Sequence, residues 1–153
     1  DNRVRARWAE LYAQQRIAPQ VERAARSGQV ASGLRRRLEQ LIMQLPQLVG
    51  PDEPPARLHG DLWGGNVIRD ERGEPVLIDP AVYAGHREVD LAMMKLFGGF
   101  SERVFAAYHA AYPLERGHEE RVPLYQLYPL LVHVNLFGGS YVSGVERCIA
   151  YWV

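Results

Sequence analysis

The polar residues best suited to chemistry lie in one short segment near the middle of the chain. His59 and Asp61 begin a glycine-containing loop that ends at Asn66, and Asp79 follows a short apolar stretch downstream. An aspartate such as Asp61 can accept a proton from a hydroxyl group and orient it for attack. Asn66 and Asp79 supply amide and carboxylate oxygens, the hard ligands that suit Mg²⁺. Together these residues predict metal-assisted phosphoryl transfer to a hydroxyl group.

A β-hairpin is expected to bring the two oxygen ligands together. Residues 66–69 and 75–78 read as its strands, and the turn between them ends at Gly73, where positive φ is needed. With the turn centred between Arg72 and Gly73, facing residues sum to about 145, which places Asn66 opposite Asp79 with Cβ atoms roughly 5 Å apart. Two ligands are too few for a protein cage, so water and a phosphate-bearing substrate would supply the others.

The order of Asp61, Asn66 and Asp79 resembles the catalytic loop of protein kinases, in which an Asp acts as base and an Asn and a second Asp hold the metal. Two features depart from protein kinases. Gly60 stands where they carry an arginine that reads a phosphorylated loop, and Pro80 follows Asp79 in place of Phe-Gly. The departures disfavour a protein kinase that is switched by phosphorylation.

Several other polar residues are expected to support the structure of this site. His59 is interpreted as a structural histidine that hydrogen-bonds the Asp79 region, and Asp90 as an inward carboxylate that braces the backbone of the loop. His133 and Asn135 lie in an apolar helix, where they are either satisfied polar groups or substrate contacts.

Helices are expected on both sides of the hairpin. The apolar spacing predicts helices over residues 3–25, 88–97, 123–137 and 139–153. Two further helices are expected to begin at N-caps, one at Ser32 with an apolar face that extends to Leu45, and one at Ser101. Pro19 should kink or split the first helix. In the helix after Ser101, the side chains expected to face inward are Val104, Phe105 and Tyr108. The sequence thus predicts a mainly helical α+β fold with one small β-hairpin at the catalytic loop.

Composition excludes several kinds of partner. The chain has 153 residues and a formal net charge of zero, so it shows no signal for nucleic-acid or membrane binding. No apolar run approaches the ~18 residues of a membrane helix. The single cysteine, Cys148, rules out an internal disulfide framework and favours a reducing, cytoplasmic location.

The run of residues 35–37, all arginine, is interpreted as a solvated helix face, with an anion site as the alternative. Nothing in the sequence indicates an oligomeric state.

The chain resembles the fructosamine kinase family, also called ketosamine-3-kinases, within the aminoglycoside-phosphotransferase branch of the kinase superfamily. The segments that carry the resemblance are 59–66 (His-Gly-Asp-Leu-Trp-Gly-Gly-Asn), 78–81 (Ile-Asp-Pro-Ala), 85–92 (Gly-His-Arg-Glu-Val-Asp-Leu-Ala), 97–100 (Phe-Gly-Gly-Phe), 124–128 (Leu-Tyr-Gln-Leu-Tyr) and 135–141 (Asn-Leu-Phe-Gly-Gly-Ser-Tyr). They extend over nearly the whole chain, most firmly over residues 57–141.

This resemblance implies ATP-dependent phosphorylation of a sugar hydroxyl in ketosamines, the Amadori adducts of sugars with amines, and hence a deglycation activity on free or protein-bound substrates. By position, Asp61 would be the base, Asn66 and Asp79 the Mg²⁺ ligands, and Trp63 a wall of the sugar site. An indole face suits a sugar, and the adjacent Gly64 and Gly65 offer Trp63 no side chain to pack on.

The resemblance also implies a domain organisation. Residues 1–153 look like the C-terminal, catalytic and substrate-binding lobe of a kinase-like protein. No glycine-rich phosphate loop and no strand lysine paired with a helix glutamate precedes residue 59. The N-terminal ATP-binding lobe is therefore expected to be absent from this chain.

Three alternatives compete with this interpretation. One is another small-molecule phosphotransferase, similar to the aminoglycoside, choline or homoserine kinases. A second is a metal-dependent phosphoesterase, which is disfavoured because such sites need two metals and several histidines, and Val67 stands where His or Asp would be required. The third is a non-catalytic lobe that keeps the motif and only binds a substrate or a partner.

Overall fold

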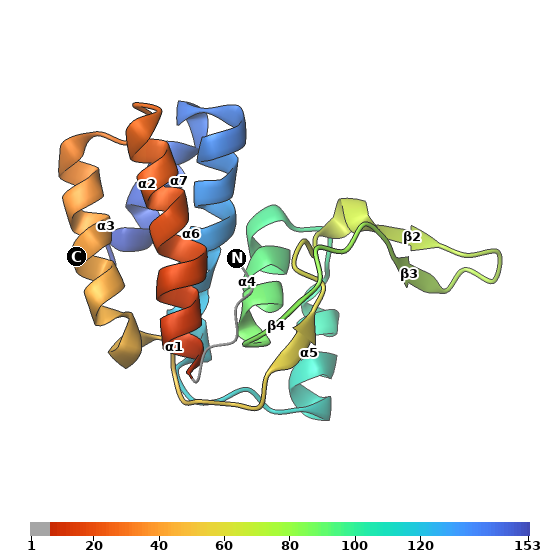
Figure 1. Ribbon diagram of the computed structural model, residues 1–153. Coiled ribbons are helices and arrows are strands. Elements are labelled where there is room, and N and C mark those ends of the chain that lie inside the picture. Colours follow the sequence, from red (N-terminus) through yellow and green to blue (C-terminus); the bar gives the residue numbers. More distant parts are fainter. Residues whose placement is uncertain (1–6) are drawn as a thin grey trace. The chain divides into compact units, whose positions relative to one another are not determined.

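The computed structural model describes residues 7–153, which divide into two compact units (Figure 1). Of the described residues, one unit comprises 7–52 and 123–153, and the other comprises 53–122. The first consists of helices, and the second combines helices with two small antiparallel sheets. The expectation of a mainly helical α+β chain is therefore confirmed. Within the described residues, no helix has both the length and the apolar character needed to cross a membrane.

The helices and strands follow the order that the apolar spacing predicts, with shifted ends. Their bounds are α1 Trp8–Leu11, η1 Tyr12–Ile17, α2 Ala18–Arg26, α3 Ser32–Leu48, β1 Ala56–Leu58, η2 Gly64–Asn66, β2 Val67–Arg69, β3 Pro75–Leu77, β4 Tyr83–Gly85, α4 Glu88–Phe97, α5 Glu102–Ala111, α6 His118–Phe137, η3 Gly139–Tyr141 and α7 Val142–Ile149. Helix α6 begins five residues before the expected start at Pro123, and the last helix ends at Ile149.

The first helical stretch accommodates its proline by a local change of helix type. The described part runs from Trp8 to Arg26 without a break, and residues 3–6 of the expected helix lie outside the described residues. Residues Tyr12–Ile17 form a π-helical segment, and Pro19 falls in the first turn of α2. A proline is tolerated there because its missing N–H needs no partner, and a π segment is a recognised way to absorb such an interruption. The helix type therefore changes just before Pro19, and the stretch is not split there.

The core of the helical unit is formed by apolar side chains from α3, α6 and their neighbours. Helix α3 begins at Ser32 with Ala31 as its N-cap, so the expected cap at Ser32 is one residue too late. The most deeply buried side chains of this unit are Tyr12, Ile17, Leu38, Leu41, Leu45, Leu124, Tyr125, Leu127, Leu131, Val134, Val145 and Ile149. Burying each Leu or Ile contributes roughly 1.5–3 kcal/mol relative to leaving it exposed.

Two buried tyrosines tie this core together through their hydroxyl groups. Tyr12 donates to the carbonyl oxygen of Leu124 over 2.8 Å, and Tyr125 donates to that of Val49 over 2.5 Å. The indole N–H of Trp8 in turn donates to the Tyr125 hydroxyl over 3.0 Å. These bonds offset the cost of burying polar groups, which is why aromatic residues with a polar end can occupy the centre of the unit.

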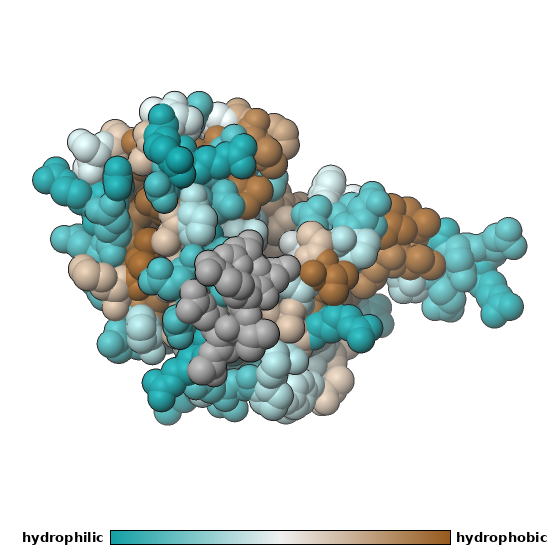
Figure 2. Space-filling view, in the orientation of Figure 1, coloured by the Kyte–Doolittle hydropathy of each residue, from teal (hydrophilic) through white to brown (hydrophobic). Residues whose placement is uncertain are grey.

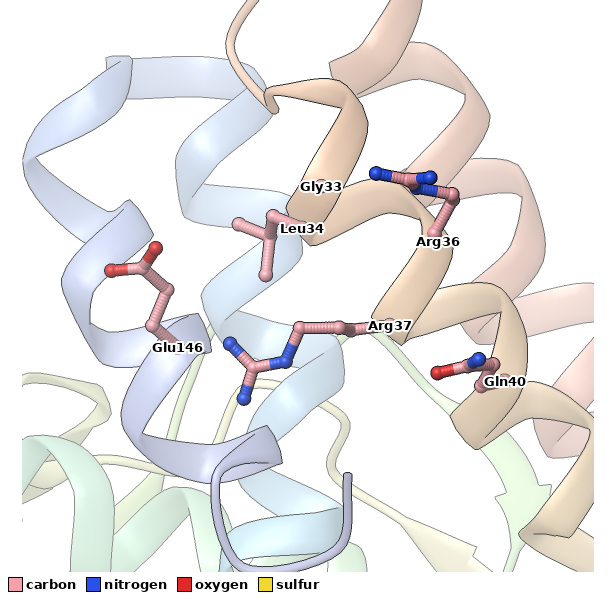
Figure 3. Close-up of a pocket in the computed structure, with 6 residues that line it drawn as sticks. All are labelled: Gly33, Leu34, Arg36, Arg37, Gln40 and Glu146. Atoms are coloured by element: carbon pink, nitrogen blue, oxygen red, sulfur yellow. The ribbon is translucent and has the colours of Figure 1, made fainter.

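The arginine run on α3 borders a shallow pocket beside α7 (Figure 3). Arg37 extends from α3 toward α7 and donates to the carbonyl oxygen of Val153 over 2.8 Å. Arg35 forms an ion pair with Glu39 one turn along the same helix, at 2.8 Å. Arg35 and Arg36 are exposed, as expected of a solvated helix face, whereas Arg37 is half-buried.

The second unit contains two separate two-stranded sheets where a single hairpin was expected. Strands β2 and β3 form that hairpin, and β1 pairs with β4, with Leu58 facing Tyr83. The β1–β4 pair escaped sequence reasoning because its strands have three residues each and no turn joins them. The hairpin carries exposed apolar side chains along its strands, including Ile68 and Leu77, and a hydrophilic tip (Figure 2).

Helix α5 is less buried than the sequence predicts. It begins after Ser101 as expected, but none of its residues is buried and Val104 is 42% exposed. The prediction of an inward position is therefore wrong for Val104, whereas Phe105 and Tyr108 are half-buried, unlike the other, exposed residues of the helix. Lys95 lies 5.4 Å from the centre of the Phe105 ring, and such cation–π contacts need no enclosed core.

Two buried ion pairs hold the start of α4. Arg87 makes two hydrogen bonds to the Glu53 carboxylate, at 2.8 and 3.0 Å, and Arg121 makes two to Glu88, at 2.9 and 2.6 Å. Hydrogen bonding to Arg87 lowers the pKa of Glu53 below its ordinary value of 4.5. Such paired, hydrogen-bonded geometry compensates charged groups for their loss of water. The first turn of α4 is therefore fixed from two sides.

We predict that Glu53→Gln destabilises the protein in a pH-dependent way. Because the pKa of Glu53 is lower in the folded chain, the stabilisation is complete above about pH 4.5 and is lost as the pH falls through the folded-state pKa. The variant should lose about 1–3 kcal/mol of unfolding free energy at pH 7, and the difference from wild type should shrink below pH 4.5. Urea unfolding across this pH range measures it.

The matched control is Glu39→Gln, which breaks the half-exposed Arg35–Glu39 pair. An exposed pair contributes little, so this change should cost less than about 0.5 kcal/mol at any pH. Equal losses in the two variants at pH 7 would show that the Glu53 pair contributes no more than a surface pair.

Candidate active site

The backbone at the start of the predicted catalytic loop is bound by a single carboxylate. The two oxygens of Asp90, in α4, accept hydrogen bonds from the backbone N–H groups of His59, at 2.7 Å, and Gly60, at 2.9 Å. Burial raises the pKa of the Asp90 carboxyl, whereas these N–H groups favour its charged form. The structure thus gives Asp90 the backbone contacts that its position in the sequence suggested.

The His59 side chain connects the loop with the end of the hairpin. Its Nδ1 accepts a hydrogen bond from the Asp61 backbone N–H at 3.3 Å, and its Nε2 lies 2.9 Å from the carbonyl oxygen of Ile78. This network assigns the proton to Nε2, which donates to Ile78. The His59 carbonyl also accepts from the Ala81 N–H at 2.8 Å. His59 therefore makes the contact expected of it, with the residue next to Asp79.

Gly60 is required by the backbone. Its φ is +81°, a conformation that favours glycine. A Cβ at this position would lie 2.9 Å from the carbonyl carbon of Ala81 and closer still to the oxygen. The position at which protein kinases carry arginine is thus filled here by a residue that must have no side chain.

The two ends of the loop are joined through Asn66. Its Nδ2 donates to the backbone oxygen of Asp61 at 2.8 Å and to the Asp61 side-chain Oδ2 at 3.1 Å. Asn66 is only 7% exposed, whereas Asp61 is partly exposed. The bond occupies one oxygen of Asp61 and orients the carboxylate, while Asn66 keeps its own Oδ1 for another contact. The structure therefore brings the predicted base and one predicted metal ligand together.

The hairpin register differs by one residue from the expected one. The pairs are Val67 with Leu77 and Ile68 with Val76, and the Ile78 N–H donates to the Asn66 carbonyl over 3.0 Å. Ile78 therefore lies opposite Asn66, and the predicted pairing of Asn66 with Asp79 is wrong. Arg69 pairs with Pro75, where the expected register would pair it with Val76, so the connection between the strands is one residue shorter than predicted.

Asp79 has a backbone conformation that sets it apart from its neighbours. Its φ is 51°, and it is the one residue other than glycine with positive φ in the part of the chain that the structure describes. Such conformations cost of order 1–3 kcal/mol and gather at functional sites. The strand alternation ends at Asp79, so the direction of its side chain is set by this local turn.

The oxygen atoms of Asn66 and Asp79 suit a Mg²⁺ ion. Asn66 directs its Nδ2 to Asp61, which leaves Oδ1 as its acceptor. The Asp79 carboxylate is exposed and makes no hydrogen bond or ion pair with residues 7–153. Those residues contain no group of three or more His, Cys, Asp or Glu that could hold a metal. Two oxygen donors fit an ion that takes its other ligands from water and substrate phosphates.

Trp63 lies over the glycine two positions after it. Its side chain is 41% exposed, and its six-membered ring occupies the space that a Cβ on Gly65 would fill, with Cζ3 at 2.7 Å from that position. The expectation that Gly64 and Gly65 leave the indole without packing therefore needs correction. The backbone of Gly65 forms the surface on which the ring lies.

A second glycine contact fixes the middle of the loop. The N–H of Gly64 donates to the carbonyl oxygen of Gly98 at 2.9 Å, and a Cβ on Gly64 would lie 2.7 Å from the Cα of Gly99. Gly98 and Gly99 have φ of 74° and 94°, just after α4 ends. Sequence reasoning listed these glycines only as part of the family resemblance, because nothing local shows where they pack.

His133 and Asn135 lie in the other unit, on α6. The Nδ1 of His133 is 2.8 Å from the carbonyl oxygen of Pro129, and the Nδ2 of Asn135 donates to the backbone and side-chain oxygens of Gln20. Both side chains thus have partners within their own unit. The structure adds no contact that assigns them to a substrate.

Comparison with known proteins identifies the family. The family model for fructosamine kinases matches residues 1–153, so the chain belongs to the fructosamine kinase family. It is 46% identical over 138 residues to the ketosamine-3-kinase of Mus musculus, covering 88% of this chain and 43% of that protein. It is 45% identical over 146 residues to a protein of Lactiplantibacillus plantarum named "Probable ketoamine kinase", covering 93% of this chain and 51% of the relative.

A solved structure shows the same fold. A crystal structure from Thermobifida fusca, named as a fructosamine-3-kinase, superposes with a TM-score of 0.94 at 47% sequence identity. The match covers 99% of this chain and 52% of that one. The chain thus spans about half the length of the relatives it matches.

We predict that Asp90→Asn opens the start of the catalytic loop. The amide cannot accept both backbone N–H groups, and hydrogen bonds to a charged group are worth roughly 1.5–3 kcal/mol each. Amide hydrogen exchange at His59 and Gly60 should therefore speed up at least ~10-fold.

Asp70→Asn is the matched control. Asp70 also accepts two backbone N–H groups, those of Arg72 and Glu74, but at the exposed hairpin turn. It should leave exchange at His59 and Gly60 unchanged. If Asp90→Asn behaves like this control, Asp90 does not hold the loop.

Proposed function

We propose that this chain is the catalytic half of an ATP-dependent small-molecule kinase that phosphorylates a sugar hydroxyl of ketosamines. The observation that carries the proposal is the closed loop in which Asn66 holds Asp61 by two hydrogen bonds, on a chain that belongs to the fructosamine kinase family. The relatives named as ketoamine and ketosamine kinases support the acceptor class.

In this proposal Asp61 is the general base. One of its carboxylate oxygens is hydrogen-bonded to Asn66, and the other takes the proton of the acceptor hydroxyl. The hydroxyl oxygen then forms a bond to the γ-phosphorus of ATP, and the bond from that phosphorus to the β,γ-bridging oxygen breaks. ADP leaves with the electron pair of that bond, and the acceptor becomes a phosphate ester.

Asn66 and Asp79 would hold Mg²⁺ through Asn66 Oδ1 and the Asp79 carboxylate. The ion, when bound, neutralises charge on the phosphates of the nucleotide. The protein would present Asn66 Oδ1 and the Asp79 carboxylate, neither of which has a competing partner. The positive φ gives Asp79 a backbone conformation that a continued strand would not produce.

Trp63 would form one wall of the sugar site. It follows Asp61 by two residues within the closed loop, and a half-exposed indole is unusual on a surface that binds nothing. Its flat, apolar face suits the carbon-bound hydrogens of a sugar, while the indole N–H remains a donor.

The other groups that bind ATP are proposed to lie in a preceding N-terminal lobe, absent from this chain. No segment before residue 59 has the sequence of a phosphate-binding loop. The chain also spans about half the length of its relatives. The exposed apolar side chains of the hairpin, Ile68, Val76 and Leu77, offer surface that such a lobe or a nucleotide would cover.

The decisive test measures phosphorylation of ketosamines by the full-length protein, with aminoglycosides, choline and homoserine as competing acceptors. We predict that Asp61→Asn lowers turnover at least ~10²-fold while ATP binding survives, because only the base is lost. Asp79→Ala is the contrasting variant, in which Mg²⁺-dependent nucleotide binding should weaken. Turnover of Asp61→Asn near wild type removes Asp61 from the mechanism, and preference for another acceptor on the panel replaces the ketosamine assignment.

We predict that Trp63→Ala loses activity toward ketosamines by one to three orders of magnitude, since a stacked aromatic contributes roughly 1–3 kcal/mol. Acceptor-independent ATP hydrolysis should fall far less, because the proposed metal ligands are untouched. Steady-state rates of both reactions check this. Equal losses would mean that Trp63 only holds the loop together.

A further inference from the structure

Gly65 differs from the other glycines of the site in the group that occupies the space where a side chain would be. A Cβ on Gly60 or Gly64 would meet backbone atoms of Ala81, or of Gly98 and Gly99. A Cβ on Gly65 would instead meet three ring atoms of Trp63, namely Cζ2, Cη2 and Cζ3. The three atoms nearest to the position of this Cβ thus all belong to the indole ring.

The backbone gives no other reason for glycine at this position. Gly65 is not among the glycines with positive φ in residues 7–153, and it lies in the short 3₁₀ turn Gly64–Asn66, which any residue can adopt. It is also exposed, so a methyl group would find room were the ring elsewhere. What glycine provides here is a flat patch of backbone on which an indole can lie.

The location of this contact connects it with the chemistry. Asn66 bonds to Asp61 and closes the loop 61–66, and Trp63 is the large exposed side chain within it. Gly64 is anchored by its bond to Gly98, so the backbone under the ring is held. With the backbone fixed at both ends, the orientation of the indole depends on the surface that Gly65 offers.

We propose that Gly65 is a specificity-determining residue that sets the position of the Trp63 ring and thereby the fit of the sugar acceptor beside Asp61. The inference rests on the proposed role of Trp63 as a wall of the sugar site. Any side chain at position 65 would occupy the space of the indole ring and displace the ring from the Gly65 backbone. Because the ring is the end of a rotatable side chain, the fold yields by moving Trp63 and leaves the backbone in place.

The test uses the full-length protein with a ketosamine acceptor, the adduct of a sugar with an amine. Gly65→Ala should raise the KM for the ketosamine tenfold or more while the KM for ATP changes less than twofold. Its melting temperature should stay close to that of wild type. A residue that merely supported the fold would shift both KM values, or the melting temperature, together.

A double-variant cycle makes the test specific to the ring. In a Trp63→Ala background the added Gly65→Ala change should have less than a twofold effect, because the new methyl group meets no indole. Gly64→Ala, whose methyl group meets the backbone of Gly98 and Gly99, should lower activity equally in both backgrounds. Should Gly65→Ala fail to fold, the double variant with Trp63→Ala must fold if the inference is right.

A spectroscopic readout follows the ring without any turnover. The emission of Trp63 is obtained as the difference between proteins with Trp63 and with Trp63→Phe, which cancels the other tryptophans. Gly65→Ala should shift this difference spectrum to the red as the ring moves into water. Gly33→Ala, an exposed position with open space around its Cβ and no positive φ, should leave the spectrum unchanged.

The outcomes separate the inference from the proposed function. If Trp63→Ala loses ketosamine activity but Gly65→Ala does not, the proposed function stands and the inference is overturned. A loss in Gly65→Ala that persists undiminished in the Trp63→Ala background also overturns it, because the glycine would then act through the backbone. If Trp63→Ala keeps full ketosamine activity, the sugar wall and the inference that rests on it both fall.

Discussion

The site depends on one interaction, the pair of hydrogen bonds that the Asp90 carboxylate accepts from His59 and Gly60. A carboxylate at this depth is costly to bury, and these bonds are what compensate it. The helix that carries Asp90 must itself be fixed, and the pairs Arg87–Glu53 and Glu88–Arg121 do so at its first turn. These charged groups thus fix where the proposed catalytic loop begins.

From that point the loop is built mainly by backbone. Gly60 approaches Ala81 and Gly64 approaches Gly99, at distances that leave no space for a side chain. Because backbone groups satisfy one another, the loop uses only one carboxylate oxygen of Asp61, the Oδ2 that accepts from Asn66. Asn66 is the exception, since its Nδ2 holds Asp61 while its Oδ1 remains for a cation. Rigid support and available oxygens are what phosphoryl transfer requires, because most of that catalysis is positioning and electrostatics.

Local signals predicted the parts that local chemistry controls. Turn residues 70–73 placed the hairpin, and apolar spacing placed α4 over its observed bounds Glu88–Phe97. The errors arose where a partner distant in the sequence decides. The hairpin register shifted by one residue because Ile78, and not Asp79, bonds to Asn66. Helix α5 has the pattern of a buried face, yet none of its residues is fully buried and Val104 is exposed, because periodicity cannot show how completely a face is covered.

The sequence by itself determined the residue types at the site, their spacing and the family, since residue types suited to phosphoryl transfer occur in a recognisable order in the loop 59–66 and at Asp79. Only the tertiary structure decided how these residues are held. Backbone atoms, which the sequence does not distinguish, make three of these contacts. They are the pairing of β1 with β4, the approach of Gly64 to Gly99 and the packing of the Trp63 ring on Gly65. The sequence does not distinguish a glycine that forms a turn from one that allows a neighbouring backbone to approach or one on which a ring packs. The difference lies in what occupies the space beside it, and that space exists only once the chain has folded.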